Sequence, residues 1–205
     1  MHEPKVSLRV LSWKEAAAFV HLWPTHLISL VNPDDVHLVA ASPRPDLHRL
    51  ELHVADVTDP GHPHAATEQD VTRIIEFGRG LHDGDRLLCH CRGGIGRSPA
   101  AAIIALVAAG LPPSHAWERV RDVRSRSRPN PWLLLLADRQ LTDSDPDGIM
   151  ATWLVWAHRQ EFWWPVPARV VAQVRSGRAS WETRVELVMA QTHKKRGVDR
   201  GRLRS

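Results

Sequence analysis

The fold is decided by one run of nine residues, His90-Cys91-Arg92-Gly93-Gly94-Ile95-Gly96-Arg97-Ser98. An apolar segment, 86–89, precedes this run, and a helix-forming segment, 99–107, follows it. Glycine-rich backbone between a strand and a helix exposes a row of N–H groups, and the positive end of the helix dipole faces the same loop. The run therefore predicts a strand–loop–helix unit that binds a dianion such as phosphate.

Reactive side chains stand at both ends of this loop. Thiols beside cations and helix N-termini have pKa values of roughly 3.5–7.5 instead of about 8.5, so Cys91 is expected to be a thiolate. Arg97 can hold two phosphate oxygens with its planar guanidinium, and Ser98 can donate a hydrogen bond to the sulfur. These residue types predict a cysteine that attacks phosphorus and forms a phosphocysteine.

The run resembles the active-site loop of the cysteine-based protein tyrosine and dual-specificity phosphatases, in which His and Cys are followed by five residues, Arg, and Ser or Thr. His90, Cys91, Arg97 and Ser98 match this pattern position by position. The resemblance is to small bacterial members and covers roughly residues 5–155. It implies that no metal or organic cofactor is needed. It also implies that substrate phosphate is bound by the loop residues between the cysteine and the arginine: Arg92, Gly93, Gly94, Ile95 and Gly96.

The resemblance leaves a choice for some of these positions. It implies that His90 holds the loop and tunes the thiol, and the alternative is a core histidine at a strand end. Ile95 stands where lipid-directed members often carry lysine, which weakens a lipid substrate. Cys89, two residues before Cys91, is expected to be a buried small hydrophobe, with reversible disulfide protection of the nucleophile as the alternative.

Phosphocysteine formation expels an oxyanion that needs a proton, and a carboxylic acid on a nearby loop can supply it. In the resembled family this aspartate follows a strand a few tens of residues before the cysteine. Asp56 ends a predicted strand 35 residues before Cys91 and is the expected acid, with Asp59 as its competitor. Asn130 follows Arg128 and Pro129 in a segment that resembles the one bracing the loop. It is expected to orient the loop or the attacking water, or only to cap a helix.

Strands and helices alternate along the chain, which predicts an α/β domain with a central, mostly parallel sheet flanked by helices. Ser12 with Glu15, Thr67 with Asp70, Ser114 and Asn130 are candidate helix caps. The expected strands are 7–11, 26–31, 49–54 and 86–90, and 32–35 reads as a turn. The expected helices are 13–20, 68–81, 99–110, 115–124 and 131–141.

A different composition sets in after the predicted 5–155 domain. Residues 156–205 hold 11 Lys and Arg but 4 Asp and Glu, which predicts a helical extension with a basic tail that could contact an anionic partner. Four tryptophans at the junction are expected to cover an apolar face of the domain, with a contact surface for a partner as the alternative. They are Trp153, Trp156, Trp163 and Trp164.

Composition limits the class of protein. The chain has 205 residues, 43% of them hydrophobic, and no apolar run of about 18 residues, so a transmembrane helix is not expected. The start of the chain leads into no long apolar segment, so no secretory signal is expected. With 2 cysteines in all, a reducing, cytoplasmic location is predicted. A Cys-His-Cys sequence on a strand has poor chelating geometry, so no metal site is predicted.

These observations favour a phosphomonoester hydrolase that acts through a phosphocysteine on phosphotyrosine or phosphoserine/threonine in protein. Two alternatives stay open. One keeps the enzyme class but takes an inositol phosphate or another small phosphoester as substrate. The other is a module that binds phosphate without turnover, against which the complete set of Cys91, Arg97 and Ser98 argues, because a binding loop does not need the thiol.

Overall fold

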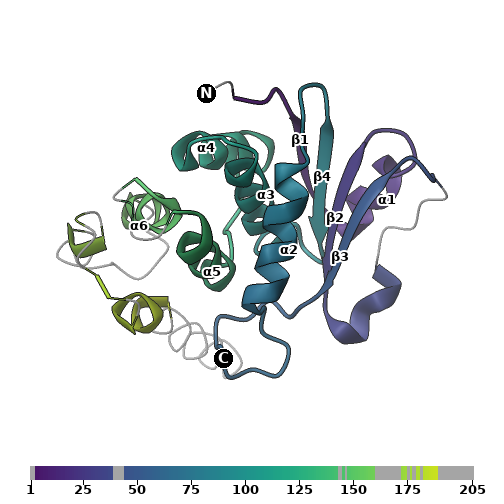
Figure 1. Ribbon diagram of the computed structural model, residues 1–205. Helices are drawn as coiled ribbons and strands as arrows, with labels where there is room; N and C mark the ends of the chain where they lie inside the picture. Colours follow the sequence, from purple (N-terminus) through teal and green to yellow (C-terminus); the bar gives the residue numbers. More distant parts are fainter. Residues whose placement is uncertain are drawn as a thin grey trace, which may run out of the picture.

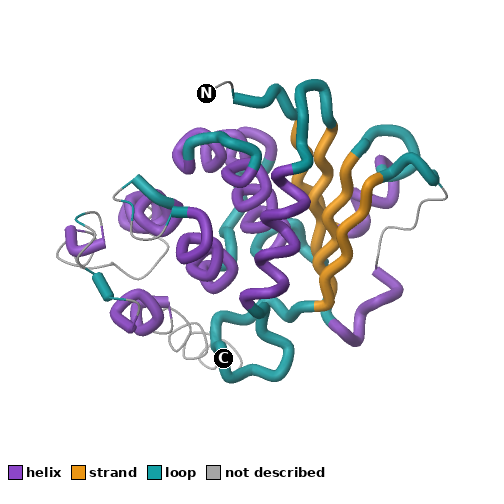
Figure 2. The backbone as a smooth tube through the Cα atoms, viewed as in Figure 1, coloured by secondary structure: helices purple, strands orange, loops and turns teal. Residues whose placement is uncertain are grey.

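Four parallel strands form one sheet at the centre of the computed structural model, in the order β1-β4-β2-β3 (Figures 1 and 2). The strands are β1 Ser7–Ser12, β2 His26–Val31, β3 His48–His53 and β4 Arg86–Cys91. The structure describes residues 3–38, 44–142, 145, 147–159, 172–174, 176, 179–180 and 182–188. The predicted α/β fold with a central parallel sheet is thus confirmed.

The domain around the sheet contains six α-helices and one short 3-10 helix within the described residues up to 159. They are α1 Trp13–Phe19, η1 Pro33–Leu38, α2 Glu68–Arg79, α3 Arg97–Ala108, α4 Pro113–Val123, α5 Pro131–Leu141 and α6 Ile149–Arg159. The larger helices lie on one side of the sheet, and α1 lies on the other (Figure 1). Alternate residues of the central strands therefore enter different cores. Ile28 and Leu87 join the large core, whereas Leu27 and Leu88 join a smaller one with α1.

Helix α3 is the element that carries the glycine-rich loop into the large core. Its residues from Arg97 to Leu106 are all buried, because α2, α4, α5 and the sheet surround it. A helix that is apolar on every side is expected in such a position. The loop is consequently fixed at both ends, by a central strand and by the most buried helix of the domain.

Most predicted helix boundaries are confirmed, and one cap is wrong. Capping boxes form at Ser12 with Glu15 and at Thr67 with Asp70, and the Asn130 side chain accepts from two backbone N–H groups of α5. Ser114 does not cap α4, which begins at Pro113. The fixed φ of Pro113 suits the first position of a helix. Helix α4 therefore begins at this proline, and no side chain caps it. The predicted turn at 32–35 is the start of η1.

The tryptophans of α6 pack against the domain. Trp153 is buried, and the rings of Trp156 and Trp117 lie 5.3 Å apart. Trp163 and Trp164 lie outside the described residues, as does the basic end of the chain. Helix α6 runs across the expected boundary at 155/156, and the division into 5–155 and 156–205 stays a prediction. Within the described residues, no helix is both long and apolar enough to span a bilayer.

Candidate active site

The nine-residue run forms the predicted strand–loop–helix unit at the carboxyl end of β4. Gly94 has a φ of +67°, and a Cβ at this position would lie 2.6 Å from the backbone nitrogen of Ser12. A side chain is therefore excluded both by conformation and by space. The loop packs directly against the end of β1, which is the neighbour of β4 in the sheet.

The outer side of the loop is held by main-chain hydrogen bonds from the segment that precedes α5. The Arg128 N–H donates to the Ile95 carbonyl over 2.7 Å, and the Asn130 N–H donates to the Gly96 carbonyl over 3.1 Å. This segment is the one that the phosphatase resemblance identified as a brace of the loop. Both loop carbonyls are thus fixed on the side facing this segment.

The carbonyls of Gly93 and Gly94, which precede Ile95 and Gly96 in the loop, are held by the side chain of Arg124. Arg124 donates from Nε to the Gly94 carbonyl and from Nη2 to the Gly93 carbonyl, each over 3.1 Å. In a trans peptide unit the N–H points away from the C=O. The Gly94 N–H, whose peptide carbonyl belongs to Gly93, accordingly points inward and donates to Cys91 Sγ over 3.2 Å.

The Cys91 sulfur is buried and accepts two hydrogen bonds. One comes from the Gly94 N–H, and the other comes from Ser98 Oγ over 3.2 Å. Cys89 is also buried and free, and its burial raises the pKa of its thiol far above the usual range. The two neighbouring thiols thus differ in their surroundings, and donors converge on Cys91. The placement of Cys89 fits the expected small buried hydrophobe.

Arg97 lies buried beside the loop at the start of α3. Its Nη1 donates to the Val54 carbonyl over 2.6 Å and to Asn32 Oδ1 over 3.0 Å. Its Nε is buried and has no hydrogen-bond partner within the described part of the chain. A buried cation with an unused donor is costly unless a ligand completes it, so this N–H is available to donate to an anion.

His90 is fully buried behind the loop. Its Nε2 lies 2.7 Å from Ser29 Oγ, on β2. The pKa of the imidazole is lowered to about 4, mainly by burial; the negative charge of Glu51 opposes this, and the positive charge of Arg97 adds a smaller lowering. The ring is therefore neutral at neutral pH, and it ties the end of β4 to β2.

The two candidate acids lie in different surroundings. The Asp56 side chain is exposed and accepts from Asn130 Nδ2 over 2.9 Å. Its carboxylate also lies against the loop, because a Cβ at Gly96 would be 2.5 Å from Oδ2. Asp59 instead accepts from the Gly61 N–H, within its own turn. The structure thus brings Asp56 into contact with the loop, whereas the hydrogen bond of Asp59 stays within its own turn.

Two loop side chains face solvent. Arg92 is 69% exposed, and its Nη1 lies 3.7 Å from Asp35 Oδ2. Ile95 is 42% exposed. Both side chains thus stand at the solvent-exposed surface of the loop.

Sequence reasoning missed several residues that the structure places at the loop. Ser29 reaches His90, Asn32 reaches Arg97, and Arg124 reaches two loop carbonyls while pairing with Glu15. The capping motif at 12–15 indicated a helix start and nothing about the loop. No local signal separates Arg124 from the other arginines near it, because its partners are distant in the sequence.

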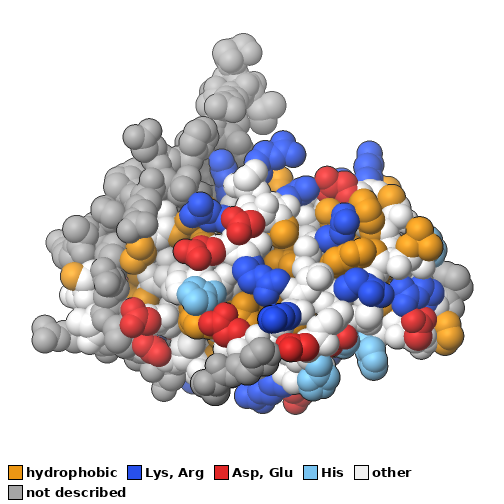
Figure 3. Space-filling view, turned by 90° about the horizontal axis from the view of Figure 1, so that it is seen from above, with side chains coloured by type: hydrophobic (Ala, Val, Ile, Leu, Met, Phe, Trp, Pro, Cys, Tyr) orange, Lys and Arg blue, Asp and Glu red, His pale blue; other side chains and the backbone are white. Residues whose placement is uncertain are grey.

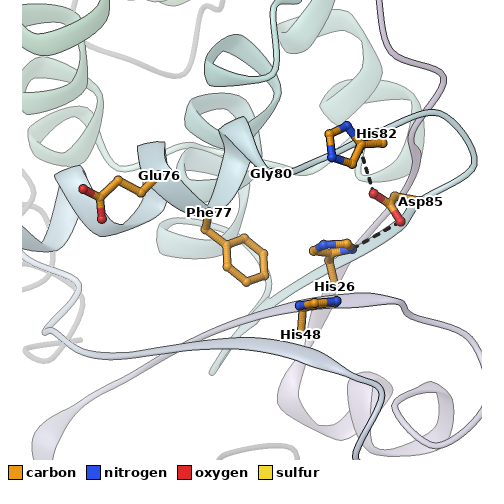
Figure 4. A pocket seen from close by; sticks show the side chains of 7 residues that line it. All are labelled: His26, His48, Glu76, Phe77, Gly80, His82 and Asp85. Atoms are coloured by element: carbon orange, nitrogen blue, oxygen red, sulfur yellow. Dashed lines mark hydrogen bonds and ion pairs between the residues drawn. The ribbon is translucent and has the colours of Figure 1, made fainter.

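A second group of ionisable side chains lies at the opposite end of the sheet (Figure 4). It lines a cavity of about 430 Å³ with His26, His48, Glu76, Phe77, Gly80, His82 and Asp85. The His26 and His48 rings stack at 4.7 Å, and Glu76 points away from them in this view. Across the described residues, no group of three or more His, Cys, Asp or Glu is arranged to hold a metal ion.

The chain is similar to several solved structures. No protein-family model and no curated protein matches the chain. PTPMT1 in complex with PI(5)P is 17% identical with a TM-score of 0.46, and the match covers 67% of this chain and 92% of that one. Human DUSP28 is 21% identical with a TM-score of 0.45 and coverages of 66% and 88%. Cydia pomonella PTP-2 phosphatase is 19% identical with a TM-score of 0.47 and coverages of 64% and 83%. These phosphatases are what the chain is similar to.

Proposed function

We propose that this protein is a phosphomonoester hydrolase that acts through a phosphocysteine, as a protein tyrosine or dual-specificity phosphatase. The observation that carries the proposal is the set of donors around one sulfur. Cys91 Sγ receives the Gly94 N–H and the Ser98 hydroxyl, and the buried Arg97 beside the loop has an unused Nε donor. Such a site stabilises a thiolate and the equatorial oxygens of a transferring phosphoryl group.

The first step forms a sulfur–phosphorus bond. The Cys91 thiolate attacks phosphorus in line with the ester oxygen, and the bond from phosphorus to that oxygen breaks. The loop amides and Arg97 hold the three equatorial oxygens during the transfer. Asp56 gives its proton to the departing oxygen, so the products are an alcohol or phenol and the phosphocysteine.

The second step returns the enzyme to its first state. The Asp56 carboxylate takes a proton from a water molecule, whose oxygen attacks phosphorus as the sulfur leaves. Ser98 donates a hydrogen bond to the departing Cys91 thiolate and makes it a better leaving group. Inorganic phosphate is released. Every proton in this cycle moves between substrate, water and this chain's own residues.

A protein substrate suits the surface of the loop. Arg92 and Ile95 are both exposed there, so a cationic group and an apolar group flank the phosphate position. A phosphorylated peptide offers acidic and apolar neighbours that such groups contact. Phosphopeptides are therefore proposed as substrates, and a cytoplasmic location fits a thiolate nucleophile.

The test compares two cysteines that are two residues apart. Wild-type protein should hydrolyse an aryl phosphate in the presence of EDTA and should be inhibited by vanadate. Cys91→Ser should lower kcat by roughly 10³-fold or more, because the nucleophile is lost. The matched control, Cys89→Ala, should keep kcat within a few-fold. Full activity in Cys91→Ser would show that Cys91 is not the nucleophile, and the proposed function would then be wrong.

A further inference from the structure

Arg124, at the carboxyl end of α4, connects three parts of the chain. Its Nε and Nη2 donate to the Gly94 and Gly93 carbonyls, and its Nη1 pairs with Glu15 Oε1 over 3.0 Å. The side chain is 14% exposed, so the guanidinium is largely covered. One planar group thus bonds two consecutive loop carbonyls and a carboxylate.

The Glu15 carboxylate is also held by the capping box at the start of α1. Glu15 Oε2 accepts from both the backbone N–H and the hydroxyl of Ser12, each over 2.7 Å. The hydrogen bond from Arg124 is the largest cause that lowers the pKa of Glu15 to about 2, and the bonds from Ser12 add to it. Glu15 is therefore ionised at every pH at which the protein would be assayed, and the start of α1 backs the loop through Arg124.

The orientation of two peptide units depends on these bonds. Arg124 holds the carbonyls of Gly93 and Gly94 outward, and planarity then turns the N–H groups of Gly94 and Ile95 toward the opposite side. For Gly94 this side contains Cys91 Sγ, at 3.2 Å. Glycine peptides rotate easily, so a loop with two adjacent glycines needs an external group to hold one orientation.

The remaining carbonyls of the loop need no side chain for the same purpose. Backbone N–H groups of Arg128 and Asn130 hold Ile95 and Gly96. Among the described residues, no backbone N–H donates to the Gly93 or Gly94 carbonyl, and Arg124 donates to both. The fork of a guanidinium can serve both carbonyls and Glu15 together, whereas an ammonium is a single point charge.

We propose that Arg124, backed by Glu15, is a positioning residue that orients the Gly93–Gly94 and Gly94–Ile95 peptides toward the phosphate site. This inference rests on the proposed function, since it assigns those amides to the binding of an oxyanion and to the Cys91 thiolate. Arg124 bonds the loop carbonyls and Glu15, so it would act through the loop and not on the reacting atoms. Its removal should therefore weaken anion binding and thiolate stability together, while the fold persists.

The test measures the thiol and the anion site without turnover. The rate of alkylation of Cys91 by iodoacetamide is followed against pH, with the modified cysteine identified by mass spectrometry. Protection by inorganic phosphate gives its dissociation constant. The variants are Arg124→Ala, Arg124→Lys and Glu15→Gln. The control is Arg121→Ala, which removes an exposed arginine from the same helix.

Arg124→Ala should raise the pH midpoint of alkylation by about one unit and weaken phosphate about tenfold, as expected when aligned donors are lost. Arg124→Lys should lie close to Arg124→Ala, and Glu15→Gln should shift both readouts in the same direction but less. Arg121→Ala should match wild type. If Arg124→Ala does not fold, Arg124→Lys and Glu15→Gln carry the same test.

The outcomes separate the two proposals. If folded Arg124 and Glu15 variants match Arg121→Ala in both readouts, Arg124 does not position the loop, and the phosphatase proposal stands. If wild-type Cys91 reacts with a midpoint near 8.5 and phosphate gives no protection, the proposed function fails instead. A changed melting temperature with unchanged midpoint and phosphate affinity would mean a structural role only, and would overturn the inference.

Discussion

The two ends of the central sheet carry ionisable side chains in very different arrangements. At the amino end, His26 and His48 stack on each other, and Asp85 lies 3.5 Å from His26. At the carboxyl end, the Gly94 N–H and the Ser98 hydroxyl donate to one sulfur, and the buried Arg97 lies beside the same loop. Figure 3, which looks down on the molecule, shows side chains of both charges and histidines intermixed on the face seen from above.

The difference shows how the proposed phosphate site is distinguished from the opposite end of the sheet. Side chains at the amino end bond mostly to each other, as when Thr25 donates to Asp85 and lies 2.9 Å from the His26 ring nitrogen. At the carboxyl end, parallel strands finish together and α3 begins, so backbone dipoles point into one loop. The proposed chemistry therefore depends on the peptide N–H groups of the loop and the start of α3, and not on the number of titratable side chains nearby.

The largest effect is expected from the candidate acid. Asp56→Asn should lower turnover by about 10²–10⁴-fold on alkyl phosphates with poor leaving groups and much less on aryl phosphates with good ones. The reason is that a good leaving group departs without a proton. Steady-state rates across a series of leaving groups measure this.

Two controls connect this prediction to the comparison of the sheet ends. Asp59→Asn should keep the wild-type dependence on the leaving group, and His48→Ala, at the amino end, should leave kcat unchanged. Equal slowing of all substrates by Asp56→Asn would remove Asp56 from the role of acid.

A smaller effect is expected from Arg97→Lys, which keeps the charge but removes the fork. The variant should lose about 10²–10³-fold in kcat/KM, because a lysine cannot bond Val54, Asn32 and a phosphate oxygen together. Vanadate inhibition should weaken in parallel. Arg9→Lys is the matched control, since Arg9 stacks over Phe19 away from the loop. An Arg97→Lys variant with wild-type vanadate affinity would contradict the assignment.

The smallest effect concerns stability against pH and separates the two ends by their histidines. Burial lowers the pKa of His90 to about 4 and lowers that of His26 below its usual value. In both cases the unfolded chain binds more protons than the folded one below pH 6.5, so stability falls as pH falls. For His90 the loss accumulates between pH 6.5 and 4 and reaches about 3 kcal/mol.

Urea unfolding at several pH values checks this. His90→Gln should flatten the pH dependence between 6.5 and 4 strongly, and His26→Gln should flatten it less, because Asp85 opposes the burial of His26. If His26→Gln had the larger effect, the buried imidazole behind the loop would not be the principal acid-sensitive group.

Local pattern was sufficient for much of the fold. Alternation and apolar runs located the four strands, and the capping motifs at 12–15, 67–70 and 130 set helix starts, because these signals act within a few residues. The wrong cap at Ser114 arose because a proline pair upstream starts α4 without a side-chain bond.

For the site, the sequence by itself determined the loop residues, because thiol, glycines and arginine are adjacent in the chain and their chemistry needs that spacing. The tertiary structure alone decided which aspartate contacts Gly96 and which arginine holds the Gly93 and Gly94 carbonyls. Those contacts join segments that are about 30 or more residues apart. No local pattern encodes them, since they exist only once the parallel strands and α3 bring the segments to one edge of the sheet.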